Sequence, residues 1–266
     1  EVITGAIRAA ELEIEAAVER TARSPMIRDQ HDYRVALFDA QGRKLTGRSY
    51  SALVEPVFRY FDDGDVHPGD VFFWNDPYNS SGGIGHIPDL CTTIPIFFED
   101  RLIGFSQVFG HHDDVGGAVP GSMPVQARDM WTEGLVIPPI KLYEKGQINQ
   151  AALTIIERNS RLSEHLRGDI DAEIGAALLG SRRVVELAFR YGADVLEAGF
   201  EEIIRNCTET IREELLPKIR DGVYQWEDYI ENDGVAGPKM HALRLTMTKT
   251  PKKIILDFSG TDPEAS

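Results

Sequence analysis

The chain has 266 residues, of which 42% are hydrophobic, and a formal net charge of −15 at pH 7. A core of this size can support one large domain or two small ones, whereas the negative charge argues against a nucleic-acid partner, because phosphate binding requires clustered Lys and Arg. No apolar run approaches the roughly 18 residues of a membrane-spanning helix, and the two cysteines make no disulfide framework, so we expect a cytoplasmic protein without a membrane partner.

Apolar side chains at helical spacing predict a first helix over residues 4–23. Glu and Arg residues lie between the positions of the apolar face, and Pro25 is expected to end the helix. The apolar face consists of Ile7, Ala10, Ile14 and Val18. This pattern is typical of a helix that packs one side against a core.

The following segments predict two strands with a short helix between them. Residues 33–39 alternate and are rich in β-formers, and the four residues that start at Asp39 have the composition of a hairpin turn. A short helix is expected over residues 51–61. The apolar run 71–74 predicts a buried strand that leads directly into Asn75 and its polar neighbours.

Two loops rich in histidine and aspartate flank the next pair of β-like runs. His86-Ile87-Pro88-Asp89 precedes the run 93–98, and His111-His112-Asp113-Asp114 follows the run 102–109. Loops joined by a hairpin-like unit can meet at one end of a sheet. Imidazole and carboxylate groups that converge there are typical of a divalent metal site, so the sequence predicts an enzyme or an enzyme subunit.

His86, Asp89 and His111 are the candidate metal ligands. Glycines before His86 exclude a regular helix, and Pro88 biases Ile87 toward an extended conformation, so a tight turn could aim His86 and Asp89 at one ion. Neutral imidazole and carboxylate suit Zn²⁺, Mn²⁺ or Fe²⁺, and this ligand set leaves coordination positions open for substrate or water. The alternative is that these side chains only order glycine-rich turns.

His112, Asp113 and Asp114 form a second group of candidates. One of them could fix the tautomer of a ligand histidine, and another could act as a general base. Because neighbouring residues in a strand point to opposite faces, we do not expect both His111 and His112 to face the metal. The alternative for the two aspartates is turn and cap chemistry.

Residues 115–122 form a glycine-rich loop that could bind an anion through backbone N–H groups. The loop is not a P-loop, and no GxGxxG follows a predicted strand, so the main nucleotide site is expected on another chain. A flexible loop that contacts a partner is the alternative. Serine-hydrolase chemistry has no support because GxSxG is absent, and Cys91 and Cys207 both lie in apolar patterns typical of a core.

The last part of the chain predicts helices and then strands. Apolar stripes indicate two helices, over residues 166–188 and 196–215, which are expected to pack as an antiparallel pair. β-like runs return at residues 222–229, 242–248 and 253–258. This order predicts an α+β fold in which mixed β-sheet regions flank a central antiparallel helical pair, within a larger multi-subunit enzyme.

Three regions are therefore expected along the chain. Residues 1–150 form an α+β region that carries the site loops, and residues 151–217 form a helical region. Residues 218–266 form a β region that is expected to continue beyond the given chain.

Several motifs, in order along nearly the whole chain, resemble the hydantoinase B/oxoprolinase family. They are TARSPMIRDQHDYRVALFDAQGRK, NDPYNSSGGIGHIPDL, GHHDDVGGAVPGSMP, EGLVIPPIKLYEKG, ERNSR, RGDIDAEIGA and DFSGTDP. The family includes N-methylhydantoin and 5-oxoproline hydrolases and ATP-dependent acetone and acetophenone carboxylases. In acetone carboxylases of this family, manganese is bound by a His, an Asp three residues later and a second His 25 residues after the first. The resemblance places this pattern on His86, Asp89 and His111.

The resemblance implies a partner and leaves three functions to weigh. A hydantoinase-A-like subunit would bind ATP and Mg²⁺, so a hetero-oligomer is expected. The sequence Gly-Ile-Gly-His-Ile-Pro-Asp is nearer to the ketone carboxylases, in which a metal-polarised ketone would lose a proton to His112 or Asp114 and react with CO₂ derived from bicarbonate. The alternatives are an ATP-dependent cyclic-amide hydrolase of the N-methylhydantoinase or 5-oxoprolinase type and a non-catalytic scaffold.

Overall fold

The computed structural model describes residues 1–46, 52–232, 237 and 239–263. Contacts divide the chain into two units. The first unit comprises Glu1–Pro124 and Asp129–Ile204, and the second comprises Val125–Arg128 and Arg205–Ser266. Within the described ranges, no helix is both long enough and apolar enough to cross a membrane.

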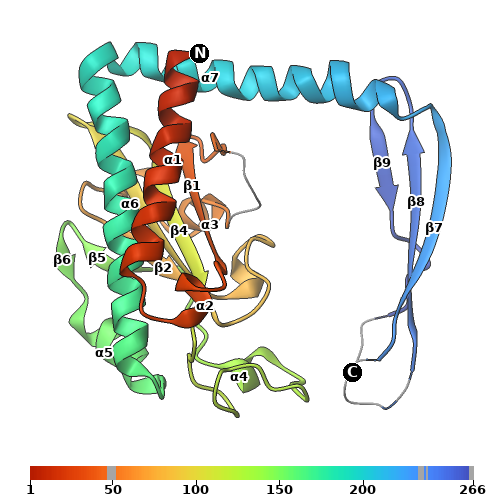
Figure 1. Ribbon diagram of the computed structural model, residues 1–266, viewed down its shortest axis with the longest axis horizontal. Coiled ribbons are helices and arrows are strands. Elements are labelled where there is room, and N and C mark those ends of the chain that lie inside the picture. The colour runs from red at the N-terminus through yellow and green to blue at the C-terminus, as the bar shows by residue number, and fades with distance from the viewer. Residues whose placement is uncertain (47–51, 233–236, 238, 264–266) are drawn as a thin grey trace. The chain divides into compact units, whose positions relative to one another are not determined.

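A six-stranded antiparallel sheet lies at the centre of the first unit (Figure 1), with the strand order β1-β4-β3-β2-β5-β6. The strands are β1 (Tyr33–Asp39), β2 (Val71–Trp74), β3 (Asp89–Phe98), β4 (Arg101–His111), β5 (Ile140–Glu144) and β6 (Gln147–Ile148). The two longest strands, β3 and β4, form a hairpin. The expected strands 33–39 and 71–74 and the expected hairpin-like unit are therefore confirmed.

Both faces of this sheet are buried, which explains its nearly continuous apolar runs. In β1, Val35 and Leu37 pack in one core, whereas Ala36 and Phe38 pack in a second core on the other face. The first core is completed by helices and the second by the segment around α3 (Glu55–Tyr60). The predicted helix 51–61 corresponds to α3, although residue 51 lies outside the described residues.

Helices precede, connect and follow the strands of this sheet. They are α1 (Val2–Thr21), α2 (Pro25–Arg28), α4 (Met130–Glu133), α5 (Gln150–Asn159), α6 (Ser163–Tyr191) and α7 (Ala193–Glu209), with short 3₁₀ turns η1 (Asp63–Asp65) and η2 (Pro77–Asn79). Pro25 does not itself end α1. It occupies the first position of α2, where its missing N–H leaves no unsatisfied donor.

Helix α6 belongs to an antiparallel helical pair, but its partner is α1 rather than the following helix. Gly180 of α6 lies against Ile14, and Arg183 forms an ion pair with Glu13, so later residues of α6 meet earlier residues of α1. Figure 1 shows the two helices side by side across the sheet. The α+β class is confirmed, whereas the partner of α6 corrects the predicted pairing of helices 166–188 and 196–215.

A single residue explains why α7 does not fold back along α6. Gly192 alone separates the two helices, and its φ of +84° ends α6 in a conformation that favours glycine. Antiparallel helices joined by a turn usually need about two to five connecting residues. Helix α7 instead buries Leu196 and Phe200 in the first core.

The second unit contains a three-stranded antiparallel sheet with the order β7-β8-β9. Its elements are a π-helical turn (Thr210–Leu215), a 3₁₀ turn (Leu216–Lys218), β7 (Gly222–Ile230), β8 (His241–Lys249) and β9 (Ile254–Asp257). The three predicted β runs are thus confirmed. Secondary structure changes near residues 150 and 217. It stays a prediction that the chain has separate regions at residues 1–150, 151–217 and 218–266.

Candidate metal centre

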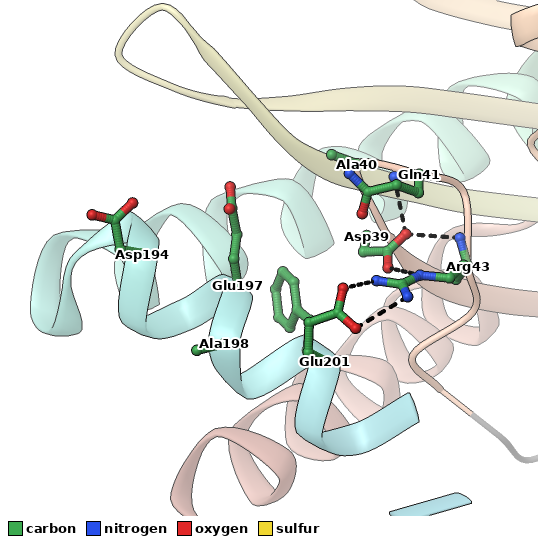
Figure 2. Close-up of a pocket in the computed structure, with 9 residues that line it drawn as sticks. Asp39, Ala40, Gln41, Arg43, Asp194, Glu197, Ala198 and Glu201 are labelled. Atoms are coloured by element: carbon green, nitrogen blue, oxygen red, sulfur yellow. Dashed lines mark hydrogen bonds and ion pairs between the residues drawn. The ribbon is translucent and has the colours of Figure 1, made fainter. Parts of the chain in front are cut away.

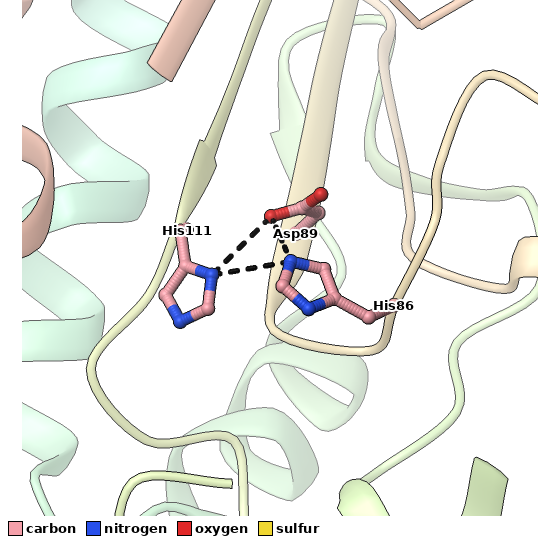
Figure 3. A group of neighbouring side chains, drawn as sticks. All are labelled: His86, Asp89 and His111. Atoms are coloured by element: carbon pink, nitrogen blue, oxygen red, sulfur yellow. Dashed lines mark hydrogen bonds and ion pairs between the residues drawn. The ribbon is translucent and has the colours of Figure 1, made fainter. Parts of the chain in front are cut away.

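The pairing of β3 with β4 brings two of the predicted ligands together. Asp89 is the first residue of β3 and lies directly opposite His111, the last residue of β4. Directly opposed residues share one face of a sheet, so both side chains point the same way. His86 lies in the turn before β3, three residues from Asp89, and its ring returns to this pair (Figure 3).

The three side chains converge on one point. Nε2 of His86 lies 3.0 Å from Oδ1 of Asp89 and 3.2 Å from Nδ1 of His111, which is 3.6 Å from the same carboxylate oxygen. With ligand bonds of about 2.1 Å, neighbouring ligands of a four- or six-coordinate ion lie roughly 3.0–3.4 Å apart. The spacing therefore fits a single divalent ion. Among the described residues, His86, Asp89 and His111 form a group of three His, Cys, Asp or Glu side chains that could hold a metal ion.

Burial and charge also suit a cation. The side chains of Asp89 and His111 are 10% and 4% exposed, whereas that of His86 is 35% exposed, so the group is open on one side. Burial opposes ionisation of Asp89, but its contacts with His111 and His86 outweigh that effect and lower its pKa. The hydrogen bond to Asp89 raises the pKa of His86 against the effect of burial. Asp89 is thus an anion, and protons compete with a metal at His86.

His112 points to the opposite face of the sheet. His111 shares the face of Phe109, whereas His112 shares the face of Val108, which packs in the first core. Its Nε2 lies 3.0 Å from Oε1 of Glu173 in α6, and both side chains are at most 1% exposed. A role for His112 as general base stays a prediction, and its buried position makes it less accessible than the triad.

Glu173 is the residue that sequence reasoning missed at this position. Its Oε2 accepts a hydrogen bond of 2.8 Å from the hydroxyl of Thr92 in β3, so the carboxyl group joins α6 to the sheet. Burial raises the pKa of Glu173, whereas its charge raises the pKa of His112 even though burial opposes this. The only signal in the sequence is a glutamate on the apolar face of a helix.

Asp114 organises the glycine-rich loop. Its carboxylate accepts hydrogen bonds from the N–H groups of Gly116, Gly121 and Arg161 and from the Arg161 guanidinium, all at 3.0–3.1 Å. Burial opposes ionisation, but the hydrogen bonds from backbone N–H groups and from Arg161 lower the pKa of Asp114. A carboxylate with four donors and a lowered pKa is a weak proton acceptor, and a role for Asp114 as general base stays a prediction.

The loop also has little capacity left to bind an anion. Two of its N–H groups donate to Asp114. In addition, the Val115 N–H donates to Ser122 Oγ, and the N–H groups of Ala118 and Ser122 donate to the carbonyl oxygens of Thr132 and Val119, respectively. Arg161 further donates to the carbonyl oxygens of Gly116, Gly117 and Val119. The loop is therefore an internally bonded structure.

Asp113, the remaining candidate of the second group, has its carboxylate 3.4 Å from the exposed ring of His165.

A separate cavity of about 460 Å³ lies between α7 and the turn that follows β1, and acidic side chains line much of it (Figure 2). Asp39 and Glu201 both form ion pairs with Arg43, which lowers the pKa of Glu201. Asp194 and Glu197 form ion pairs with Arg101. Because these carboxylates are paired with arginines, the cavity does not resemble the metal triad.

Comparisons with known proteins show where the chain belongs. The sequence profile of the hydantoinase B/oxoprolinase family matches residues 1–266. A protein of Pseudomonas sp. (strain NS671), assigned as a D-/L-hydantoinase subunit, is 32% identical over 282 residues, covering 100% of this chain and 47% of its own length. The delta subunit of acetophenone carboxylase from Aromatoleum aromaticum is 26% identical and is covered over 35% of its length.

The caprolactamase of Pseudomonas jessenii matches in both sequence and structure. Its beta subunit is 33% identical over 242 residues, which cover 88% of this chain and 41% of the subunit. The crystal structure of this ATP-dependent enzyme superposes with a TM-score of 0.85 and 27% identity, over 99% of this chain and 46% of that one. The chain spans less than half the length of these relatives, which are all subunits of larger enzymes. It belongs to the hydantoinase B/oxoprolinase family.

Proposed function

We propose that the chain is the metal-binding part of an ATP-dependent enzyme that activates the carbonyl group of a small molecule. The observation that carries this proposal is the convergence of His86, Asp89 and His111 at one end of a hairpin. These three residues would hold the ion. A divalent ion supplies Lewis acidity that polarises a carbonyl oxygen.

The chain's own residues supply three properties of such a site. Asp89 carries the negative charge that favours a cation, and its lowered pKa keeps that charge at neutral pH. The two histidines are neutral ligands that leave net positive charge on the ion. The partly exposed side of His86 is the direction from which a substrate can approach.

Hydrolysis of a cyclic amide is the reaction that we place first. The relatives at 32–33% identity are a hydantoinase subunit and a caprolactamase subunit, both named for ring amides. ATP and Mg²⁺ would be bound by a hydantoinase-A-like partner, since the sequence carries no P-loop. Carboxylation of a ketone with bicarbonate is the second candidate, supported by the similarity to an acetophenone carboxylase subunit.

Two assays on the complete complex, purified with its ATP-binding partner, test this function. Elemental analysis without added metal compares the wild type, His86→Ala and the control His31→Ala, which removes an exposed histidine beside Glu19. We expect stoichiometric Mn, Zn or Fe in the wild type and the control, and loss of the metal in His86→Ala. If none of the three samples contains metal and His86→Ala keeps full activity, the result would instead support a non-catalytic scaffold.

Substrate choice is decided by ADP release. Caprolactam, hydantoin and 5-oxoproline are offered in one series, and acetone or acetophenone with bicarbonate in the other. ADP release that depends on a ring amide and yields the ring-opened acid supports the hydrolase. Release that depends on ketone and bicarbonate together, with a carboxylated product, supports the carboxylase.

A further inference from the structure

Two side chains from distant parts of the sequence hold the backbone of Ile87, the residue that follows His86. The Ile87 N–H donates to Oε2 of Glu133 at 3.1 Å, and the Ile87 carbonyl accepts from Nδ2 of Asn75 at 2.7 Å. Ile87 itself is completely buried. Its two backbone polar groups are therefore fixed by side chains from outside the turn that carries His86 and Asp89.

Asn75 is held in one orientation by its other hydrogen bonds. Its Nδ2 also donates to the Leu135 carbonyl at 2.9 Å, and its Oδ1 accepts from the Ile137 N–H at 2.7 Å. The side chain is fully buried and directly follows β2, a strand between β3 and β5. An aspartate at this position could accept from Ile137 but could not donate to the two carbonyl groups.

Glu133 is held in place by the glycine-rich loop. It is the last residue of α4, and the neighbouring Thr132 carbonyl accepts from the N–H of Ala118. Gly117 has a φ of +79°, and a Cβ on it would lie 2.3 Å from the Glu133 carbonyl oxygen. Only glycine permits this approach. The internally bonded loop thus packs closely against the backbone of Glu133, from which its carboxylate reaches the Ile87 N–H.

We propose that Asn75 and Glu133 are positioning residues that set the geometry of the metal centre by holding the Ile87 backbone. This inference rests on the proposed function. Two further backbone hydrogen bonds of the turn are local to the ends of β3 and β4: Asp89 N–H donates to His86 O, and Pro88 O accepts from His112 N–H. The Ile87 contacts therefore connect the turn to β2 and α4, and they determine where His86 stands relative to Asp89.

Metal affinity of the purified complex is the first test, measured by Mn²⁺ titration. Loss of a group that orients a metal ligand typically lowers affinity about 10- to 100-fold, and we expect this for Asn75→Asp and Glu133→Ala. Glu133→Gln keeps an acceptor for the Ile87 N–H without the charge and should stay within about threefold of wild type. Equal losses in Glu133→Gln and Glu133→Ala would overturn the positioning role in favour of a charge effect.

Hydrogen exchange separates this inference from the proposed function. Exchange in a peptide that covers residues 84–90 should become faster in Glu133→Ala and Asn75→Asp, but not in Glu133→Gln, whether or not metal is bound. Asn149→Ala is the matched control, because it removes a 3.1 Å cap bond in α5 far along the chain. Unchanged exchange in Glu133→Ala overturns the inference. If the wild-type complex binds no metal, faster exchange in these variants still supports the hold on Ile87, whereas the metal function is refuted.

Discussion

The candidate metal triad and the pair of His112 with Glu173 both combine imidazole with carboxylate, on opposite faces of one sheet. His111 and His112 are adjacent, yet the first faces Asp89 and a partly exposed His86, whereas the second faces a carboxylate from α6. The first group is open on one side and has three converging ligand atoms. The second is enclosed, with both side chains at most 1% exposed. Strand alternation thus directs two adjacent histidines to different surroundings, one a partly exposed candidate site and the other a buried contact between α6 and the sheet.

The largest expected effect would come from removing each of the two histidines in turn. His111→Ala removes one of the three proposed ligands, and we expect Mn²⁺ affinity to fall more than about 100-fold while the metal-free protein keeps most of its stability. His112→Ala should instead lower the free energy of unfolding and change Mn²⁺ affinity by less than about tenfold. Metal titration and thermal unfolding of both variants test this. A loss of affinity in His112→Ala as large as that in His111→Ala would break the comparison.

Glu173→Ala should have the next largest effect. It leaves the imidazole of His112 and the hydroxyl of Thr92 buried without their shared partner. Removing one member of a buried charged pair costs about 3–5 kcal/mol in the free energy of unfolding. Glu173→Gln keeps the shape and a hydrogen-bond acceptor, so its loss should be smaller. Denaturant unfolding of the two variants measures the difference, and equal values would show that the hydrogen bonds do not matter.

The smallest effect concerns acid stability of the loop next to these groups. The folded pKa of Asp114 lies below its unfolded value near 3.8, so its contribution to stability is complete above that value and is lost as pH falls through the folded pKa. Asp114→Asn lacks this contribution at every pH. We therefore expect the stability difference between the wild type and Asp114→Asn to be constant from pH 7 to 5 and to shrink below about pH 4. A difference that grows on acidification would contradict this assignment.

The sequence predicted that His86, Asp89 and His111 converge because the cause is local. His86 and Asp89 are three residues apart in the sequence. The two apolar runs after Asp89 predict a hairpin, which places His111 beside Asp89. Strand periodicity also predicted that His111 and His112 face different ways. The α+β class followed from long apolar patterns that need no knowledge of which elements touch.

Only the tertiary structure decided which distant residues complete these local patterns. Glu173 meets His112 across 61 residues, and Glu133 meets Ile87 across 46, so no spacing rule connects them. Helix α6 packs against α1 rather than α7, and a single glycine with a positive φ joins α6 to α7. Asp114 looked like a base in sequence, but Arg161 and the loop N–H groups use its oxygens. Local preferences fix the side chains that a segment offers, whereas packing fixes which of them remain free to react.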